Sequence, residues 1–346
     1  MPTITGSAAK AIIKGALLSE RVEEPIAEYV AEGLVSTSLR GVDSHGIRLI
    51  HHYLNGIRSG RINRAPRYKV EQKFSTVAVL DADHTFGHAS GMEAARIAMA
   101  MAKEHGSGHV AVKNSTHLGA AAYFALEIAG HDMIGMSFTH ADSLIIPTHG
   151  KRKFLGNNPV CFAAPVEGEG PMCLDMATSI ITFNAVRRLR EIGGTAPAGV
   201  GADAEGRPTT DPHQIAMLLP VGGYKGYGLS LMVEVLCSML TGMPFGPHIP
   251  KMFEDLEQKR YLGHFVCALN IEAFQEPAVF KSRMAQLVNE LRNEPPLDPA
   301  QKVMVAGDPE KIREIARRRD GIPLEEPEFK QFKELNARYG LNINLE

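Results

Sequence analysis

A histidine within a glycine-containing loop is the first residue whose position suggests chemistry. His117 lies in the segment Asn114-Ser115-Thr116-His117-Leu118-Gly119, between an apolar run at 109–112 and a helix-like segment at 120–129. This pattern places the imidazole at the C-terminal end of a strand, where open α/β sheets bind their ligands. Because the unperturbed pKa of histidine lies near neutrality, the side chain is suited to proton transfer. By residue type alone, a structural role for His117 is the alternative.

A second loop carries polar side chains that suit a small acidic substrate. Ser44 and His45 precede Arg48, and Tyr53 follows in a helical segment. The planar guanidinium of an arginine can bind a carboxylate with two parallel hydrogen bonds. Since the chain has 14 histidines, most of them must have no catalytic role, and His45 and His117 are both candidates.

A lysine among glycines is the third candidate. Lys225 is flanked by Gly223, Gly226 and Gly228 at the start of an apolar helix. Glycines let a phosphate or ribose approach the backbone, and the first turn of a helix offers free N–H groups. The alternative is tight helix packing beside a surface lysine.

The composition and the missing motifs exclude several classes of function. Lys and Arg number 37 against 39 Asp and Glu, so no excess of base indicates a nucleic-acid or membrane-surface partner. The sequence contains neither G-x-G-x-x-G after a strand nor G-x-x-x-x-G-K-[ST], the usual Rossmann and P-loop fingerprints. No H-E-x-x-H or Cys/His cluster indicates a metal site.

Cysteine usage and the apolar segments indicate a cytoplasmic protein. Cys161, Cys173, Cys237 and Cys267 are widely spaced in apolar runs, which is typical of buried thiols in a reducing compartment. The N-terminus lacks a signal-peptide pattern. The longest apolar segment, 229–240, is interrupted by Glu234 and is too short to span a bilayer.

Alternating strand and helix signals predict an α/β fold. The first seventy residues are mostly helical, and we expect strands at 76–80, 109–112, 133–138, 172–174, 265–269 and 303–305. Ser90 and Glu93 fit a capping box that opens a helix ending near Gly106. The helix that begins near Leu229 is apolar nearly all round, which predicts burial.

A composition shift near residue 73 divides the chain into two predicted lobes. Residues 1–73 with 275–346 form a helical lobe, and residues 74–274 form a central α/β lobe for cofactor and substrate. We expect the C-terminal helices to return to the N-terminal ones.

The chain closely resembles the malate/L-lactate dehydrogenase family, which includes ureidoglycolate and sulfolactate dehydrogenases and cyclic-imine reductases. The matching segments occur in the order of the family: Asp43-Ser44-His45-Gly46, 114–120, Gly156-Asn157-Asn158-Pro159, 175–179, 208–212, 223–228 and 321–324. The resemblance implies a non-Rossmann nicotinamide-dinucleotide-binding fold with a mixed central sheet and flanking helices. It also implies NAD or NADP as cofactor, with NAD preferred, a small 2-hydroxy or 2-oxo acid as substrate, and a homodimer.

The resemblance also implies a role for particular residues. His117 is the expected acid/base, with His45 as a rival proton donor, and Ser44, Arg48 and Tyr53 contact the substrate. The expected cofactor contacts are Asn158, Asp175, Met176, Ala177, Lys225 and Gly307. In the mechanism that we expect, a substrate carboxylate binds Arg48, and His117 takes the hydroxyl proton as hydride leaves C2.

The substrate stays open at this point. Malate or L-lactate is the first expectation, while ureidoglycolate, sulfolactate and a cyclic imine are alternatives within the same family. A non-catalytic dinucleotide-binding protein is an alternative of another class.

Overall fold

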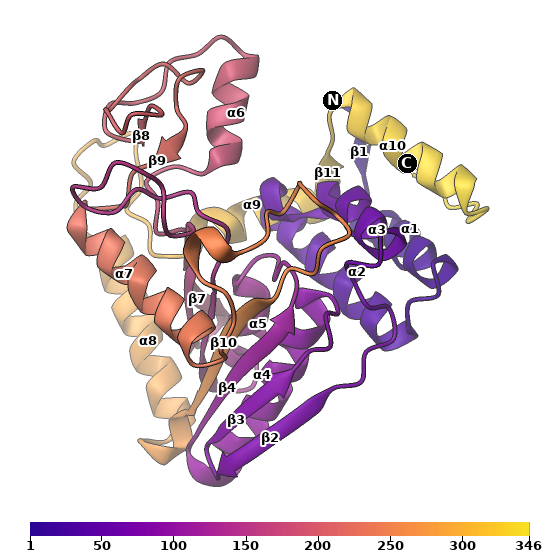
Figure 1. Cartoon of the computed structure of the whole chain (residues 1–346). Helices are drawn as coiled ribbons and strands as arrows, with labels where there is room; N and C mark the ends of the chain where they lie inside the picture. The colour runs from indigo at the N-terminus through magenta and orange to yellow at the C-terminus, as the bar shows by residue number, and fades with distance from the viewer. Residues whose placement is uncertain (346) are drawn as a thin grey trace.

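A seven-stranded mixed sheet forms the centre of the computed structural model, which describes residues 1–345 (Figure 1). Across the sheet the strands follow the order β2-β3-β4-β10-β5-β6-β7. Within it, β3 and β4 run parallel and the other neighbouring pairs run antiparallel. The bounds are β2 Lys69–Phe74, β3 Val77–Asp81, β4 Ser107–Ser115, β5 Met133–Thr139, β6 Val160–Val166, β7 Glu169–Met176 and β10 Leu262–Asn270. The predicted α/β class with a mixed sheet is confirmed.

Two alanine-rich helices cover one face of this sheet. They are α4 (Gly87–His105) and α5 (Ala122–Ala129), and their small side chains let them lie close to the strands. At Gly108 in β4, an added Cβ would collide with the carbonyl oxygen of Ala98 in α4. The opposite face is covered by α7 (Tyr224–Glu234) and the π-helical turn η3 (Val235–Met239).

The N-terminal helices and the end of the chain share a separate apolar core. Residues 4–62 and 322–335 both contribute to it, and β1 (Thr3–Ile4) pairs with β11 (Ile322–Pro323), which brings the two termini close together (Figure 1). The helices of this region are α1 (Gly6–Ser19), α2 (Glu24–Leu39), α3 (Ile50–Arg58) and α10 (Glu326–Arg338). The division into two lobes stays a prediction. Helix α8 (Pro277–Arg292), assigned to the helical lobe, contacts β6 of the sheet, and α9 (Asp308–Asp320) contacts α2.

A small irregular unit projects beyond the sheet, at the upper left of Figure 1. It contains α6 (Phe183–Glu191), β8 (Gly201–Ala202) and β9 (Met217–Leu218), with its own cluster of buried residues around Ile145, Val186 and Ile215. The predicted irregular connection at 192–212 lies here, with β8 as its regular element.

The predicted strand, loop and helix around His117 are confirmed. β4 ends at Ser115 and α5 begins at Ala122, so His117 lies in the turn between them. Two glycines allow neighbouring groups to pack closely on this turn. An added Cβ at Gly87 would collide with the carbonyl oxygen of His117, and one at Gly119, whose φ is +84°, would collide with the ring of His88.

The predicted capping box at Ser90 and Glu93 is wrong, because α4 begins three residues earlier, at Gly87. The backbone N–H of Gly87 donates to the Thr116 hydroxyl at 3.2 Å, so the capping acceptor comes from the His117 loop. Ser90 instead bonds the Ser115 hydroxyl. The predicted left-handed Gly106 at the end of α4 is confirmed, with φ +85°.

Two further expectations are wrong. Residues 303–305 form no strand, since the N–H of Val305 bonds the side chain of Asp308 in a turn that leads into α9. The apolar helix α7 and the turn η3 are also not fully buried in this chain, because Leu231, Val235 and Leu240 are 44%, 45% and 56% exposed. Exposed apolar patches of this kind are typical of surfaces that contact another molecule.

All four cysteines are free and buried, as predicted. No helix within residues 1–345 is long and apolar enough to cross a membrane. In the same residues, no group of three or more His, Cys, Asp or Glu side chains could hold a metal ion.

Candidate active site

A cavity of about 950 Å³ opens beside the His117 loop, between the sheet, the N-terminal helices and the small irregular unit. Ser44, His45 and His117 line it, together with Asp142 and Arg260. Residues nearer to α5, β7 and α9 continue the lining: Ala122, Cys173, Asp175, Ala177, Glu310 and Glu314. The volume is in the range of small-molecule and cofactor sites.

His117 is held by a buried tyrosine. The hydroxyl of Tyr53 lies 2.8 Å from Nδ1 of His117, and the Tyr53 ring is fully buried against Phe86 and His88. Burial raises the pKa of Tyr53, so its hydroxyl stays neutral. A tyrosine hydroxyl can accept the bond from Nδ1–H, and this leaves Nε2 of His117 for a reacting group.

His117 and His45 form a stacked pair. Their ring centroids are 5.4 Å apart with an angle of 25° between the planes, and Nδ1 of His45 lies 2.8 Å from the Ser44 hydroxyl. Burial lowers the pKa of His45. Burial is the largest cause that lowers the pKa of His117 well below its usual value, followed by repulsion from the His45, His52 and His88 rings in their protonated forms and from the Arg260 guanidinium. Both rings are therefore neutral near neutral pH, and each can accept a proton.

Arg260 gives the cavity a buried cation with free donors. Its side chain is 3% exposed, and Nη2 lies 2.5 Å from Oδ1 of Asp142. Nε and Nη1 have no hydrogen-bond partner in the described structure. A buried guanidinium with unused N–H groups beside a cavity suits the carboxylate of a ligand.

Of the predicted site residues, Ser44, His45, His117, Asp175 and Ala177 line the cavity. Tyr53 lies directly behind His117. The others do not line it: Arg48, Asn158, Met176, Lys225 and Gly307.

Arg48 and Asn158 are engaged elsewhere. Nε of Arg48 lies 3.1 Å from Oε1 of Glu328 in α10. The Asn158 side chain is fully buried, and its amide bonds Ala141, Ser230 and Glu234.

Of the predicted cofactor residues, Asp175 and Ala177 reach the cavity. Asp175 is surrounded by protein but open to the cavity, and its Oδ2 accepts a bond of 2.9 Å from the N–H of Ala122. Burial raises the pKa of this carboxyl. The segment that enters α7 lies beside residues 178–180, since the N–H of Val221 bonds the Thr178 carbonyl. Lys225 is exposed in the first turn of α7, which begins three residues after Val221.

Gly307 lies in a loop that packs beside β7. The carbonyl of Ala306 accepts a bond from the N–H of Cys173, and Gly307 itself has φ +96° and packs on Cys173. Glu310 of α9, one turn further on, reaches the cavity.

Asp142 and Arg260 were missed by the sequence analysis. Arg260 stands just before β10, whose Leu262 is paired with Ser115 of β4, so the arginine arrives beside the His117 turn. A charged residue next to a predicted strand could have drawn attention to Arg260. The sequence does not reveal, however, that this strand pairs with one about 150 residues earlier in the chain.

Comparisons with known proteins find a matching family model and several named relatives. The family model described as malate/L-lactate dehydrogenase matches residues 4–333. Malate dehydrogenase of Pyrococcus abyssi is 35% identical over 328 residues, covering 92% of this chain and 90% of that protein. Ureidoglycolate dehydrogenase (NAD(+)) of Escherichia coli O157:H7 is 32% identical over 313 residues, covering 90% of each. The relatives also include one named for NADP(+), from Chromohalobacter salexigens, 33% identical over 72% of this chain and 75% of that protein.

The solved structures agree with the fold. The crystal structure of malate dehydrogenase from Entamoeba histolytica matches with a TM-score of 0.92 and 32% identity, covering 98% of both chains.

Proposed function

Because the chain belongs to the malate/L-lactate dehydrogenase family and is thus a 2-hydroxy acid oxidoreductase, we propose that this cavity is its active site and His117 its proton-transfer group. The observation that carries the proposal is the Tyr53–His117 bond in the wall of a cavity that is also lined by a buried cation, Arg260. We infer a small 2-hydroxy or 2-oxo acid of the malate or L-lactate type as the substrate.

The neutral imidazole of His117 is ready to act as a base. In the oxidation direction Nε2 takes the proton of the C2 hydroxyl, while Nδ1–H stays bonded to Tyr53. In the reduction direction the protonated ring returns that proton to the C2 oxygen. When bound, a nicotinamide dinucleotide supplies the hydride acceptor or donor for C2.

We propose Arg260, in place of Arg48, as the group that binds the substrate carboxylate. Arg260 lines the cavity and has two N–H-bearing nitrogens without a partner, whereas Arg48 lies outside the lining and faces Glu328. Arg48 is only the second candidate, because its guanidinium would have to leave Glu328 to reach the substrate.

The residues on the other side of the cavity fit a dinucleotide. Asp175 has a carboxylate oxygen open to the cavity that can accept a ribose hydroxyl, and Ala177 leaves room beside it. Lys225 and the glycines before it would approach the phosphates. Met176 and Gly307 flank this side and stay proposed contacts, while the bonds of Asn158 favour a supporting role.

We propose NAD as the preferred cofactor over NADP. Glu310 and Glu314 line the cavity on the side of Asp175, and carboxylates there favour a free ribose hydroxyl and repel a phosphate.

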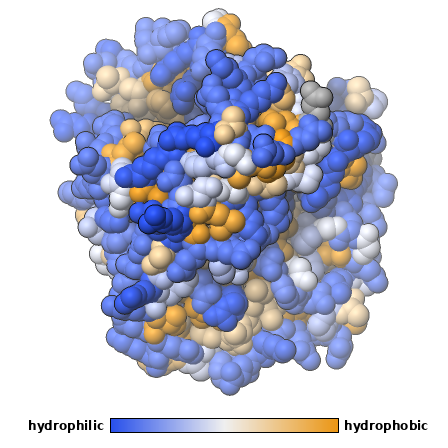
Figure 2. Space-filling model, turned by 90° about the vertical axis from the view of Figure 1, so that its right-hand side faces the viewer, coloured by the Kyte–Doolittle hydropathy of each residue, from blue (hydrophilic) through white to orange (hydrophobic). Residues whose placement is uncertain are grey.

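We also propose that the chain forms a homodimer through α7 and η3. The exposed apolar side chains of this region contrast with the face that carries α1, α3 and α10, which is mainly hydrophilic with small separate apolar patches (Figure 2). Light scattering should give the mass of two chains, and L231D, which places a charge in the patch, should give one. The free, buried cysteines support a reducing compartment such as the cytoplasm.

Oxidation of NADH and NADPH with a panel of oxo acids tests the function. The panel contains the oxo forms of malate, L-lactate, ureidoglycolate and sulfolactate, together with a cyclic imine. In H117A, kcat should fall by at least about 100-fold while NADH affinity is kept, as expected for loss of a general acid–base group.

The control is H45A, which removes the stacked neighbour and leaves the Tyr53–His117 bond. If H45A proves more damaging than H117A, the two roles are reversed. A protein that binds NADH and oxidises it with no member of the panel would be a non-catalytic dinucleotide-binding protein.

A further inference from the structure

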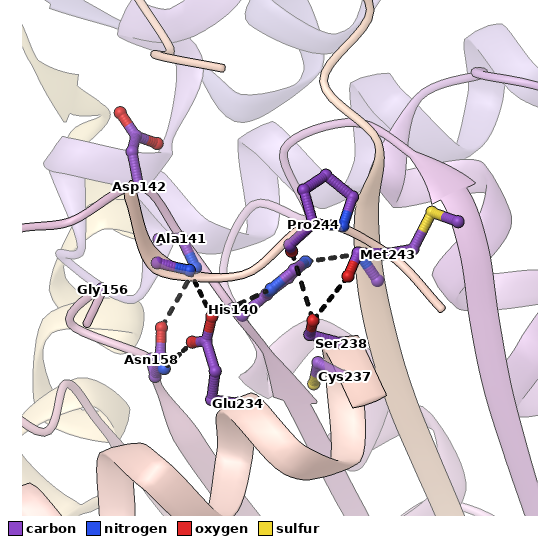
Figure 3. A network of polar contacts seen from close by, with 12 residues as sticks. His140, Ala141, Asp142, Gly156, Asn158, Glu234, Cys237, Ser238, Met243 and Pro244 are labelled. Atoms are coloured by element: carbon purple, nitrogen blue, oxygen red, sulfur yellow. Dashed lines mark hydrogen bonds and ion pairs between the residues drawn. The ribbon is translucent and has the colours of Figure 1, made fainter. Parts of the chain in front are cut away.

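A buried carboxylate lies outside the cavity, at the end of α7. Glu234 is 3% exposed, and none of its atoms belongs to the cavity lining. Its Oε1 accepts a bond of 2.8 Å from the N–H of Gly246, and its Oε2 accepts one of 2.7 Å from Nδ2 of Asn158. Figure 3 shows Glu234, Asn158 and His140 directed toward one another from three different segments.

His140 is oriented by this carboxylate. Its Nε2 accepts a bond of 2.8 Å from the N–H of Gly263, so the proton of the neutral ring must be on Nδ1. That nitrogen lies 3.7 Å from Oε1 of Glu234, too long for a good hydrogen bond but close enough for attraction. His140 follows β5 and Gly263 belongs to β10, so the contact fixes the ends of both strands beside Arg260.

Asn158 connects Glu234 by hydrogen bonds to Ala141 in the wall of the cavity. Because its Nδ2 donates to Glu234 and to the carbonyl of Ser230, its Oδ1 is left to accept the N–H of Ala141 at 3.1 Å. The next residue is Asp142, which bonds the N–H of Met252 and pairs with Arg260. Two hydrogen bonds thus connect the carboxylate of Glu234 to the turn whose Asp142 pairs with Arg260.

Because each oxygen of Glu234 accepts a bond from an N–H donor, from Gly246 and from Asn158, these contacts favour the ionised carboxylate. Burial acts to raise the pKa of Glu234, but the contacts with His140, Gly246 and Asn158 outweigh it and hold the pKa below its usual value. A buried charge with complete partners stabilises one arrangement of its surroundings, because any other arrangement leaves polar groups unpaired.

We propose that Glu234 is a positioning residue of the substrate site, which sets the turn 140–142 so that Asp142 presents Arg260 to the substrate carboxylate. This inference rests on the proposed function, in which Arg260 binds that carboxylate. Glu234 touches neither substrate nor cofactor, and it acts through Asn158 and His140.

The substitution E234Q tests this inference. Glutamine has the same shape but one acceptor oxygen, so its NH₂ group must face either the N–H of Gly246 or Nδ2 of Asn158, both of which are donors. We expect KM for the preferred oxo acid to rise by at least about tenfold, as a buried unpaired group would cause. The dissociation constant of NADH, measured without oxo acid, should stay within about threefold of that of the unmodified protein. Loss of a buried hydrogen bond to NADH itself would raise it by about tenfold.

Ser238 provides the matched control. Its buried hydroxyl, one turn beyond Glu234, donates to the carbonyls of Met243 and Pro244, and neither bond leads to residues 140–142 (Figure 3). S238A should lower the melting temperature and leave KM unchanged. If S238A raises KM as much as E234Q does, Glu234 acts only through general stability and the inference is wrong.

A double-mutant cycle separates the inference from the function on which it rests. In an R260M background, E234Q should add nothing further to KM, because its effect passes through Arg260. An unchanged KM in E234Q, or additive effects in the double variant, overturns the role of Glu234. An unchanged KM in R260M would show that Arg260 does not bind the substrate carboxylate, and the role of Glu234 through Arg260 would then also be wrong. Lack of turnover in the unmodified protein would instead overturn the proposed function.

Should E234Q fail to fold, N158A makes the same test, since it removes the bridge and keeps the carboxylate. It should raise KM for the oxo acid with the NADH dissociation constant kept, and an unchanged KM would refute the inference. A weakened NADH affinity with an unchanged KM would instead show Asn158 to be a cofactor residue.

Discussion

Replacing Tyr53 with phenylalanine should slow turnover while the fold is kept. The Tyr53 hydroxyl lies 2.8 Å from Nδ1 of His117, and the ring is fully buried against Phe86 and His88. Phenylalanine keeps these ring contacts and removes one oxygen. The substitution therefore tests whether the hydroxyl assists proton transfer, separately from packing.

The size of the effect follows from the charge that His117 acquires. When Nε2 takes a proton, the ring becomes an imidazolium, and its Nδ1–H bond to Tyr53 becomes charge-assisted. A hydrogen bond to a charged group contributes roughly 1.5–3 kcal/mol, which corresponds to a fall in kcat of about 10- to 100-fold. In the neutral resting state the same bond contributes about 1 kcal/mol, so the loss of folding stability should be small.

Steady-state oxidation of NADH by the preferred oxo acid measures kcat, and NADH fluorescence and thermal unfolding provide the two controls. Y68F is the matched substitution, because Tyr68 is a partly buried tyrosine that does not line the cavity. An unchanged kcat in Y53F would refute the role assigned to the hydroxyl. A kcat that falls only together with NADH affinity or stability would point to a disturbed fold.

Three further predictions use other features of the site. K225A should weaken NADH binding, as seen in a fluorescence titration, while kcat at saturating cofactor is nearly kept; equal affinity would remove Lys225 from the cofactor site. Burial lowers the pKa of His88 and His264 to about 3, below that of the unfolded chain, so folding stability should be lost as pH falls below 6.5. Each of these two histidines should lower the free energy of unfolding by roughly 1 kcal/mol per pH unit below 6.5, so urea should unfold the protein more easily at pH 5 than at pH 7. R260M should raise the pKa of His117 and move the acid limb of kcat/KM for hydroxy acid oxidation to higher pH; an unmoved limb would show that the two groups are not coupled.

The sequence was informative where the signal was local. The apolar run, the loop and the following helix placed His117 at the end of β4, and Gly106 marked the end of α4. Each of these depends on residues within a few positions of one another, so periodicity and capping rules suffice. The missing dinucleotide fingerprint likewise agreed with a sheet that is mixed and not doubly wound.

The parts of the site that depend on distant pairings could not be predicted. Tyr53 meets His117 across 64 positions of the chain, and Arg260 reaches the site through the register of β10 against β4. No local pattern encodes such a register. The capping box failed for the same reason, since the group that bonds the first turn of α4 is Thr116 of another segment.

The helix α7 shows a different limit. Its all-round apolar character predicted burial of both sides, and this prediction is wrong for one side of the helix in this chain. In the structure one side packs on the sheet and the other is exposed, so the same pattern now supports the proposed dimer.

The electrostatics of the cavity connect substrate binding with proton transfer. The positive charge of Arg260 is one of the causes that lower the pKa of His117, together with burial and the neighbouring histidines. A substrate carboxylate on Arg260 would offset the smallest of these causes, so the pKa of His117 would be higher with a substrate in place than without one, while burial, the largest cause, would still hold it below its usual value. His117 would then be more basic at the moment when the hydroxyl is beside it. In the absence of substrate the ring stays neutral, and this arrangement keeps the site ready for the oxidation direction over a wide range of pH.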